Sequence, residues 1–185
     1  RIAAEDLELW DRAERLAVSS GRVTELAHVL REVLRLNLPR ETEAELCDRA
    51  ARLYEETLGD PVGAAPYLER LLSRDPANQG AFARLKQILT GAERWGELED
   101  LYNRTTLAID DVPTRVDLLT EVALVCEEII EDDAKAVNYY ERTLALAPTH
   151  EVALRALDRL YQRTGAYKNL AALLETRLEG LSDDE

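Results

Sequence analysis

The two histidines and two cysteines are the first candidates for chemistry in this 185-residue sequence. His28 and His150 lie far apart, and neither has a nearby serine, cysteine or metal-ligand partner in the sequence. Catalysis and metal binding need several such groups converging on one point, so we interpret both as solvent-exposed or helix-capping residues. Cys47 and Cys126 occupy positions that are apolar in another copy of the internal repeat described below. We therefore predict two buried thiols that do not reach each other.

Two pairs of adjacent carboxylates are the next candidates, because paired carboxyl groups can serve as general acid and base. These pairs are Glu55-Glu56 and Glu127-Glu128, and they recur one repeat apart. A hydrolase built on such a pair is one interpretation, but recurrence favours a solvated helix face over a unique active site. The glycines of segment 59–63 indicate a turn between helices and not a phosphate-binding loop. We expect no catalytic residue, no metal site and no cofactor.

Composition excludes several classes of function. The sequence has 23 basic and 37 acidic residues and a net charge of −14. This balance disfavours a nucleic-acid partner, whose phosphates need a positive surface. No apolar run approaches the ~20 residues needed to cross a bilayer, so we predict no membrane span. No secretory signal is visible, and the lack of methionine together with a start inside the repeat pattern indicates an excised piece of a longer protein. Arginine-rich usage together with many Ala, Leu and Glu indicates a GC-rich genome. We expect a cytoplasmic location but leave the compartment open.

An internal repeat of 72 residues runs through the sequence without a gap. Each block divides again, and equivalent positions in the second helix of each unit are alternately 38 and 34 residues apart. Repeats of this length are typical of stacked helical hairpins. Aromatic residues at equivalent positions are expected in the core between helices and not in a ligand-binding cage. The aligned sets include Asp60 and Asp132, Trp10 with Phe82 and Leu154, Trp95 and Tyr167, Tyr67 and Tyr139, and Pro76 and Pro148.

Apolar residues recur at spacings of three and four between turn-forming residues, which is typical of amphipathic helices. No stretch alternates with a period of two, so we expect no strands. The sequence predicts ten helices in one continuous array over residues 1–185. The five antiparallel hairpins are expected at about 4–37, 41–74, 77–109, 114–146 and 150–180.

Several residues predict how individual helices begin. Asp60 followed by Pro61 is typical of a capped helix start. Pro66 either kinks a helix that begins at Pro61 or lies in the first turn of one that begins near Ala64. Capping boxes are predicted at two equivalent places, Thr42 with Glu45 and Thr114 with Asp117.

The hairpins resemble tetratricopeptide repeats. Leu154, Leu157 and Tyr161 have the spacing of that family's first helix, and Ala136, Tyr140 and Pro148 match its second-helix pattern. The resemblance covers essentially the whole chain but is degenerate, because charged residues stand where the family has a small residue in the first helix. Those residues are Glu14, Lys86 and Asp158. The resemblance implies an all-α, right-handed superhelical solenoid whose curved inner face binds other proteins. The pattern is similar to the long degenerate arrays of large bacterial proteins, which implies a bacterial origin.

In that family the first helix of each hairpin lines the concave face. Carried over one position at a time, this implies a face made of Asp11, Arg15, Glu45, Arg49, Arg52, Ala83, Gln87, Asp117, Glu121, Arg155 and Arg159. Five arginines against four carboxylates make this face less acidic than the rest of the chain. Because guanidinium groups bind carboxylates bidentately, we expect a protein or peptide partner with an acidic or mixed-charge segment. The family's peptide-carboxylate clamp, rich in Lys and Asn, is not matched, so a receptor for chaperone tails is not expected.

The favoured function is a non-enzymatic scaffold for protein–protein contacts within a larger protein. The alternative is a regulatory or sensor array attached to a catalytic domain such as a kinase. Apolar residues at both ends of the array could mediate end-to-end contacts, so the oligomeric state is left open. These are Leu7, Trp10 and Leu16 at one end and Leu170, Leu173 and Leu174 at the other.

Overall fold

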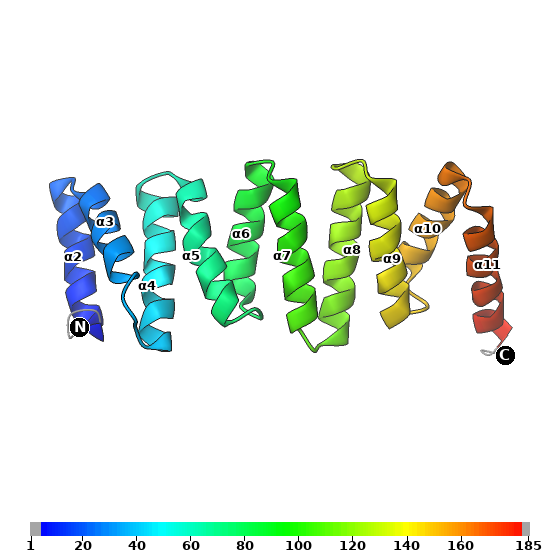
Figure 1. The fold of residues 1–185 in the computed structure, drawn as a ribbon, viewed down its shortest axis with the longest axis horizontal. Coiled ribbons are helices and arrows are strands. Elements are labelled where there is room, and N and C mark those ends of the chain that lie inside the picture. The colour runs from blue at the N-terminus through cyan, green and yellow to red at the C-terminus, as the bar shows by residue number, and fades with distance from the viewer. Residues whose placement is uncertain (1–4, 183–185) are drawn as a thin grey trace. The chain divides into compact units, whose positions relative to one another are not determined.

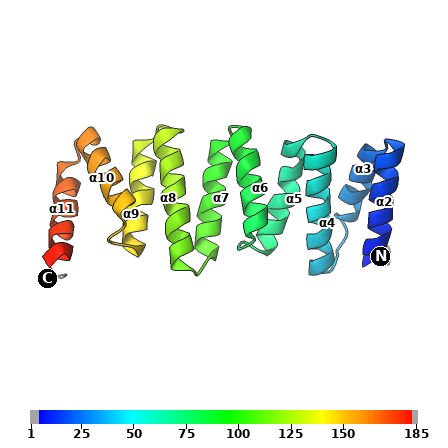
Figure 2. The same ribbon diagram turned by 180° about the vertical axis from the view of Figure 1, so that it is seen from behind.

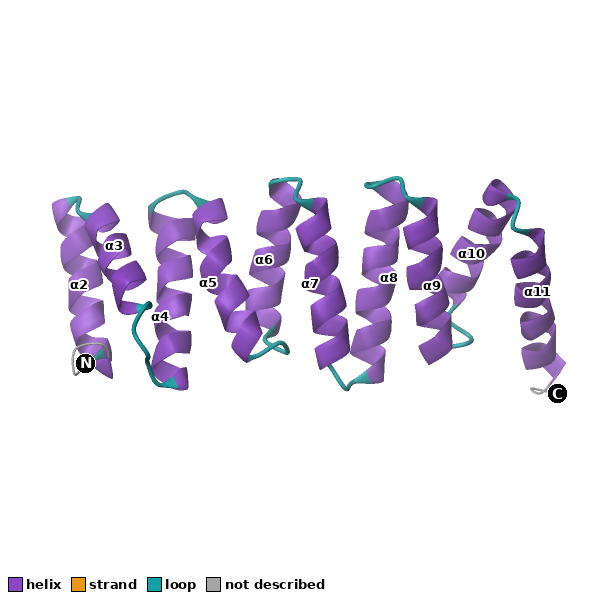
Figure 3. Ribbon diagram, viewed as in Figure 1, coloured by secondary structure: helices purple, strands orange, loops and turns teal. Residues whose placement is uncertain are grey.

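The computed structural model describes residues 5–182, with side chains described for residues 5–175. Over this range the chain forms ten α-helices and no strand (Figure 3). The predicted all-α fold of antiparallel helical hairpins is therefore confirmed. The chain divides into two compact units, Arg1–Leu101 and Tyr102–Glu185. One continuous array over residues 1–185 stays a prediction.

The first unit contains two complete hairpins and most of a third. Consecutive helices run antiparallel and connect through short turns (Figures 1 and 2). The unit consists of α2 (Leu7–Ser20) with α3 (Val23–Val33), α4 (Arg40–Arg52) with its π-helical extension η1 (Leu53–Thr57) and α5 (Pro61–Arg74), and α6 (Gln79–Gly91) with the first half of α7 (Trp95–Ala108).

The second unit begins within α7. Its helices α8 and α9 form a long hairpin, and α10 and α11 form a short one (Figure 1). Their bounds are α8 (Val112–Glu128), α9 (Asp133–Leu146), α10 (Glu151–Thr164) and α11 (Tyr167–Ser182).

The 72-residue repeat is visible in the backbone at the helix starts. Three first helices carry an N-cap side chain at equivalent positions. Asp6, Asn78 and His150 accept hydrogen bonds from backbone N–H groups three residues later, at 3.0, 2.9 and 3.3 Å. Such bonds satisfy N–H groups that have no partner within the helix. The predicted capping role of His150 is confirmed, and His28 is exposed on α3.

The helix ends repeat as well. In each short hairpin a left-handed residue closes the first helix, at Gly21, Glu93 and Gly165, with φ of 68°, 55° and 71°. In the long hairpins the last turn of the first helix is wider than an α-helical turn. Leu58 N–H donates to the Leu53 carbonyl and Ile130 N–H to the Val125 carbonyl, both at 3.0 Å and five residues apart. Left-handed residues then follow, Gly59 (φ 64°) and Glu131 (φ 59°). Local geometry therefore has the same period as the sequence.

Some expected helix starts are wrong. Neither predicted capping box forms, because both helices begin earlier. Pro39 precedes α4, so Thr42 lies inside the first turn. Asp111 caps α8 and accepts hydrogen bonds from the N–H of Thr114 at 2.9 Å and from its hydroxyl at 2.5 Å. Asp60, by contrast, caps α5 as predicted and accepts from Gly63 N–H at 3.0 Å.

Pro66 lies inside α5, because that helix begins at Pro61. A proline inside a helix has no N–H for the carbonyl four residues earlier, here that of Val62. Both residues are exposed, so water can bond the freed carbonyl and the helix continues to Arg74.

The core contains the predicted apolar positions. Trp10, Phe82 and Leu154 are buried at equivalent places, and Cys47 and Cys126 are buried at two different positions of the repeat. Burial disfavours the charged thiolate and raises the pKa of Cys47 to about 11. Tyr167 was expected in the core but is exposed, because it lies in the first turn of the last described helix, where no following hairpin covers it.

Candidate partner-binding face

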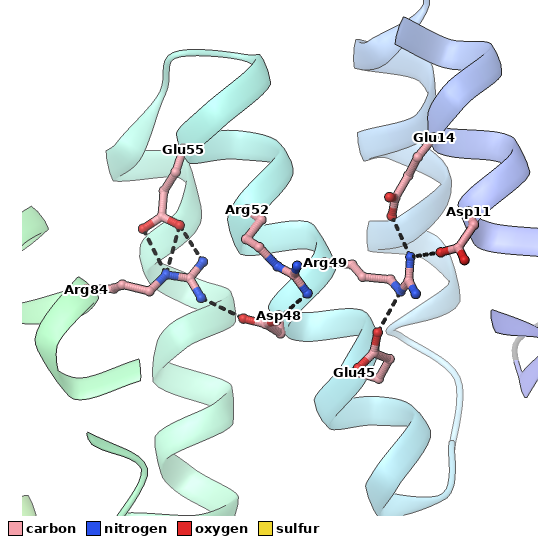
Figure 4. Close-up of polar contacts among 8 residues, drawn as sticks. All are labelled: Asp11, Glu14, Glu45, Asp48, Arg49, Arg52, Glu55 and Arg84. Carbon is pink, nitrogen blue, oxygen red and sulfur yellow. Dashed lines mark hydrogen bonds and ion pairs between the residues drawn. The ribbon is translucent and has the colours of Figure 1, made fainter. Parts of the chain in front are cut away.

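Arginine–carboxylate bridges join the first helices of neighbouring hairpins in the first unit. Arg49 of α4 is at the centre of the first group (Figure 4). Its guanidinium donates to Asp11 at 2.7 Å and to Glu14 at 3.2 Å, both on α2, and to Glu45 one turn earlier at 2.8 Å. The Arg49 side chain is only 13% exposed. Three carboxylates therefore surround one arginine between α2 and α4.

A second group joins α4 to α6. Asp48 accepts from Arg52 on its own helix and from Arg84 on α6, at 2.6 Å each (Figure 4). Arg84 also donates to Glu55 of η1, with Nε 3.0 Å from Oε2. Burial by itself lowers the pKa of Arg84, but its bonds to Glu55 and Asp48 outweigh this effect and raise the pKa. This face therefore has fixed charges of both signs.

The second unit has a related bridge between α8 and α10. Glu127 of α8 is only 6% exposed and accepts from Arg159 of α10 at 2.7 Å. The hydroxyl of Tyr140 lies 3.3 Å from the same carboxylate. Burial and then the charge of Glu127 raise the pKa of this phenol. Arg163 of α10 pairs with Asp133 at the start of α9.

These bridges correct the interpretation of the carboxylate pairs. Glu55 and Glu127 do not lie on a solvated face, because each points toward the next hairpin and binds an arginine there. Glu56 and Glu128 are exposed, as predicted. Adjacent residues point about 100° apart around a helix, so only one member of each pair faces the neighbouring hairpin.

The structure gives the predicted site residues different environments. Asp11, Glu45, Arg49 and Arg52 belong to the two bridged groups of the first unit. Arg15 is exposed and has no ion-pair partner among residues 5–175. Ala83 and Gln87 are exposed on α6, and Asp117 is exposed on α8. Glu121 accepts a hydrogen bond from the buried Tyr102 hydroxyl, and the phenol pKa is raised by burial and by this carboxylate.

The last two predicted residues differ from each other. Arg155 pairs with Glu151 on its own helix, and both side chains are exposed. Arg159 instead neutralises the nearly buried Glu127. Replacing both arginines would therefore lower stability as well as alter the surface, so the pair cannot serve as a test of binding alone.

Open clefts lie between the first helices of the first unit. A cleft of about 300 Å³ between α2 and α4 is lined by Asp11, Glu14, Arg49, Arg52 and Glu56, with Val18, Leu53 and Thr57. A cleft of about 520 Å³ between the α4–α5 hairpin and α6 is lined by Glu41, Ala44, Glu45, Asp48, Leu71, Asn78, Gly80, Ala81 and Arg84. A third, of about 430 Å³, has Pro61, Val62, Ile88, Gly91 and Ala92 beside Gln87, Glu55 and Arg84.

The bridging role of Asp48, Glu55, Arg84 and Glu127 was not predicted from the sequence. The sequence did contain a signal. Opposite charges recur about one hairpin apart, as in Asp48 and Arg84, or Glu14 and Arg49. Glu14 had been noted only as a departure from the family pattern.

Residues 5–175 contain no group of three or more His, Cys, Asp or Glu side chains arranged to hold a metal ion. Within the described helices, none is long and apolar enough to cross a membrane.

Comparisons with known proteins find solved structures of low sequence identity. No protein-family model matches the sequence, and no curated protein matches it. Among solved structures, a crystal structure of MamA is 20% identical, covers 90% of this chain and 95% of that chain, and has a TM-score of 0.45. A second crystal structure of MamA protein is 18% identical, covers 89% and 86%, and has a TM-score of 0.47. Neither comparison assigns a family or a function to this chain.

Proposed function

We propose that this chain is a non-enzymatic protein-interaction scaffold, similar to tetratricopeptide-repeat proteins, that binds a partner segment on the face of its first helices. The observation that supports this most directly is the set of clefts on the surface that α2, α4 and α6 form. The charged groups that line them are held by bridges before any partner arrives. Such preorganisation lowers the entropy lost on binding.

The charges of this face favour a mixed-charge segment over a purely acidic one. Arg49 and Arg84 are already neutralised by carboxylates of their own chain. The cleft between α2 and α4 has three carboxylates and two arginines along its walls. Basic groups of a partner would meet Glu56, which is exposed. Acidic groups would meet Arg52, which pairs with Asp48 on its own helix and whose side chain is half-exposed. Complementary charges of this kind fix the orientation of a bound segment.

The third cleft supplies a place for an apolar anchor. Val62 of α5 and Ile88 and Ala92 at the end of α6 line it, and the amide of Gln87 is among the polar groups of its lining. Apolar clefts with a few polar groups at the edge are the usual form of a side-chain pocket. We expect the partner segment to place one medium-sized apolar side chain here.

A displayed library of random 16-residue segments, selected on the immobilised protein, tests this function. Selected segments should carry charges of both signs and bind the protein with a measurable Kd. Arg52→Glu should weaken their binding about tenfold, because a charge-assisted bond becomes a repulsion. Lys168→Glu makes the same change of charge on the exposed side of α11 and serves as the matched control.

Two results would contradict the proposal. One is a library that yields no binder above background. The other is a set of binders that lose affinity equally with Arg52→Glu and Lys168→Glu, since the interaction would then depend on net charge and not on this face.

A further inference from the structure

The first hairpin exposes apolar residues at positions that are buried in the later copies. Leu9 and Leu16 of α2 are 44% and 65% exposed. Their equivalents are Ala81 and Ile88 on α6, and Ala153 and Leu160 on α10, and all four are buried. Trp10 and Ala17, the neighbouring residues of α2, are buried like their equivalents. Only one side of α2 therefore differs from α6 and α10.

The second helices show which neighbour is responsible. Val29 of α3 is 47% exposed, whereas Leu173, its equivalent in the last hairpin, is buried. The next residue shows the reverse pattern, because Leu30 is buried and its equivalent Leu174 is exposed. The last hairpin is preceded by α8–α9, and the described chain contains no hairpin ahead of α2. Positions 9, 16 and 29 thus face the side that a preceding hairpin covers.

The later copies identify the kind of element that covers this side. In the first unit α5 packs on α6, and in the second unit α9 packs on α10. Both covering helices are the second helices of long hairpins, and both are followed by the same turn into a capped first helix. Asp6 has the cap that Asn78 and His150 have after that turn.

We propose that Leu9, Leu16 and Val29 form a docking surface for a further helical hairpin of the α4–α5 class, whose second helix packs on α2 as α5 packs on α6. The described chain contains two hairpins of this class, α4–α5 and α8–α9. Their second helices are already packed on α6 and α10. A second copy of the chain therefore has no free hairpin of this class to offer. The occupant comes from outside residues 5–182.

The patch also specifies one feature of the occupant. Leu9 is larger than Ala81 and Ala153, which hold the same position in the covered copies. In the first unit Leu71 of α5 lines the same cleft as Ala81. We therefore expect the docking helix to carry a side chain smaller than leucine at the position equivalent to Leu71, because overpacking a helix interface is destabilising.

A chimera tests the proposal. Residues 39–77, with Leu71→Ala, are duplicated and fused directly ahead of Asp6 in place of residues 1–5, which reproduces the join between Ala77 and Asn78. We expect the amide hydrogens of α2 to exchange about tenfold more slowly in the chimera than in the unfused chain, because docking suppresses local opening. Leu16→Glu in the chimera should abolish this protection.

Val152→Glu is the matched control, because Val152 is exposed and its equivalents Glu8 and Gly80 are also exposed. A second chimera carries residues 111–149 in place of the duplicated residues 39–77. It controls for the case in which the fused 39–77 hairpin does not fold. The proposal is overturned if α2 exchange is unchanged in both chimeras. It is also overturned if the unfused chain sediments as a dimer that Leu16→Glu dissociates, because a second copy would then be the occupant.

Discussion

The two long hairpins, α4–α5 and α8–α9, have the same backbone signals and different polar cores. Both widen at the end of the first helix, turn through a left-handed residue and start the second helix with an aspartate cap. In the first, Glu43 is 4% exposed and binds Arg70 and Arg74 of α5. Arg70 also donates to the Leu34 carbonyl at 2.7 Å, which joins α3 to this cluster.

The second long hairpin reverses the charge at the central position. Arg115 occupies the place of Glu43, and its Nε is buried without a hydrogen-bond partner. Arg142, the equivalent of Arg70, donates instead to Asn103 Oδ1 at 3.0 Å. Its guanidinium also lies over the ring of Tyr139, 5.1 Å from the centroid.

This difference shows that the same hairpin backbone accommodates two different networks of polar side chains. A cap or a left-handed turn requires only a few adjacent residues, so it can recur unchanged with the repeat. An ion pair between helices requires two residues from different segments, and a single change of sign forces a new network.

The largest expected effect comes from breaking the Glu43 cluster. Glu43→Ala removes the nearly buried carboxylate that binds Arg70 and Arg74. We expect a loss of about 2–3 kcal/mol in unfolding free energy. Arg115→Ala, at the equivalent place, should change stability by less than about 0.5 kcal/mol, because an unsatisfied buried group is removed. Urea denaturation followed by circular dichroism measures both. Equal losses would show that the two clusters are energetically the same.

The bridges to the next hairpin should differ by a smaller amount. Arg84→Ala leaves both Asp48 and Glu55 without their partner on α6, and we expect a loss of about 1–2 kcal/mol. Arg159→Ala should cost about 1 kcal/mol, since Glu127 keeps the Tyr140 hydroxyl nearby. Arg155→Ala is the control and should be nearly neutral, because exposed pairs contribute little. A loss for Arg155→Ala as large as the other two would argue against this ranking.

The left-handed turns offer a sharper comparison. Gly59 has open space where a Cβ would lie, so Gly59→Ala should cost about 1 kcal/mol through backbone strain alone. Glu131 holds the same conformation in the second hairpin, and Glu131→Gly should stabilise the protein by about 0.5 kcal/mol. Opposite signs in thermal melts support the equivalence of these turns. A destabilised Glu131→Gly variant would mean that the Glu131 side chain makes a needed contact.

Alkaline pH should weaken the α4–α5 hairpin through the thiol of Cys47, whose equivalent position in α8–α9 is Leu119. Burial raises the pKa of Cys47 from 9.0 to about 11, so the folded state holds this proton more tightly than the unfolded state. This contribution is complete below pH ~9 and is lost as the pH rises toward ~11. From pH 7 to pH 9 we expect a loss of a few tenths of a kcal/mol that Cys47→Ala removes. An identical pH dependence in both proteins would contradict this assignment.

Much of the fold was predictable because its signals are local. The gapless 72-residue repeat located all five hairpins, and Asp60 with Pro61 marked a helix start that the structure confirms. The capping boxes failed because Pro39 and Asp111 start their helices earlier than the threonines suggested. Of the five arginines predicted on the concave face, Arg49, Arg52, Arg155 and Arg159 bind carboxylates of the chain, whereas Arg15 is exposed. Sequence spacing identified which residues share a helix face without showing what each meets across the gap between hairpins.

The sequence by itself determined the helices, their turns and the apolar stripes that pack them, since each depends on residues within about four positions of one another. Tertiary structure alone decided which carboxylate each arginine binds and which member of each glutamate pair is covered. It also decided which apolar positions stay exposed on the first hairpin. Those outcomes depend on contacts between helices about 30 to 40 residues apart, where one turn of a helix decides whether two side chains meet.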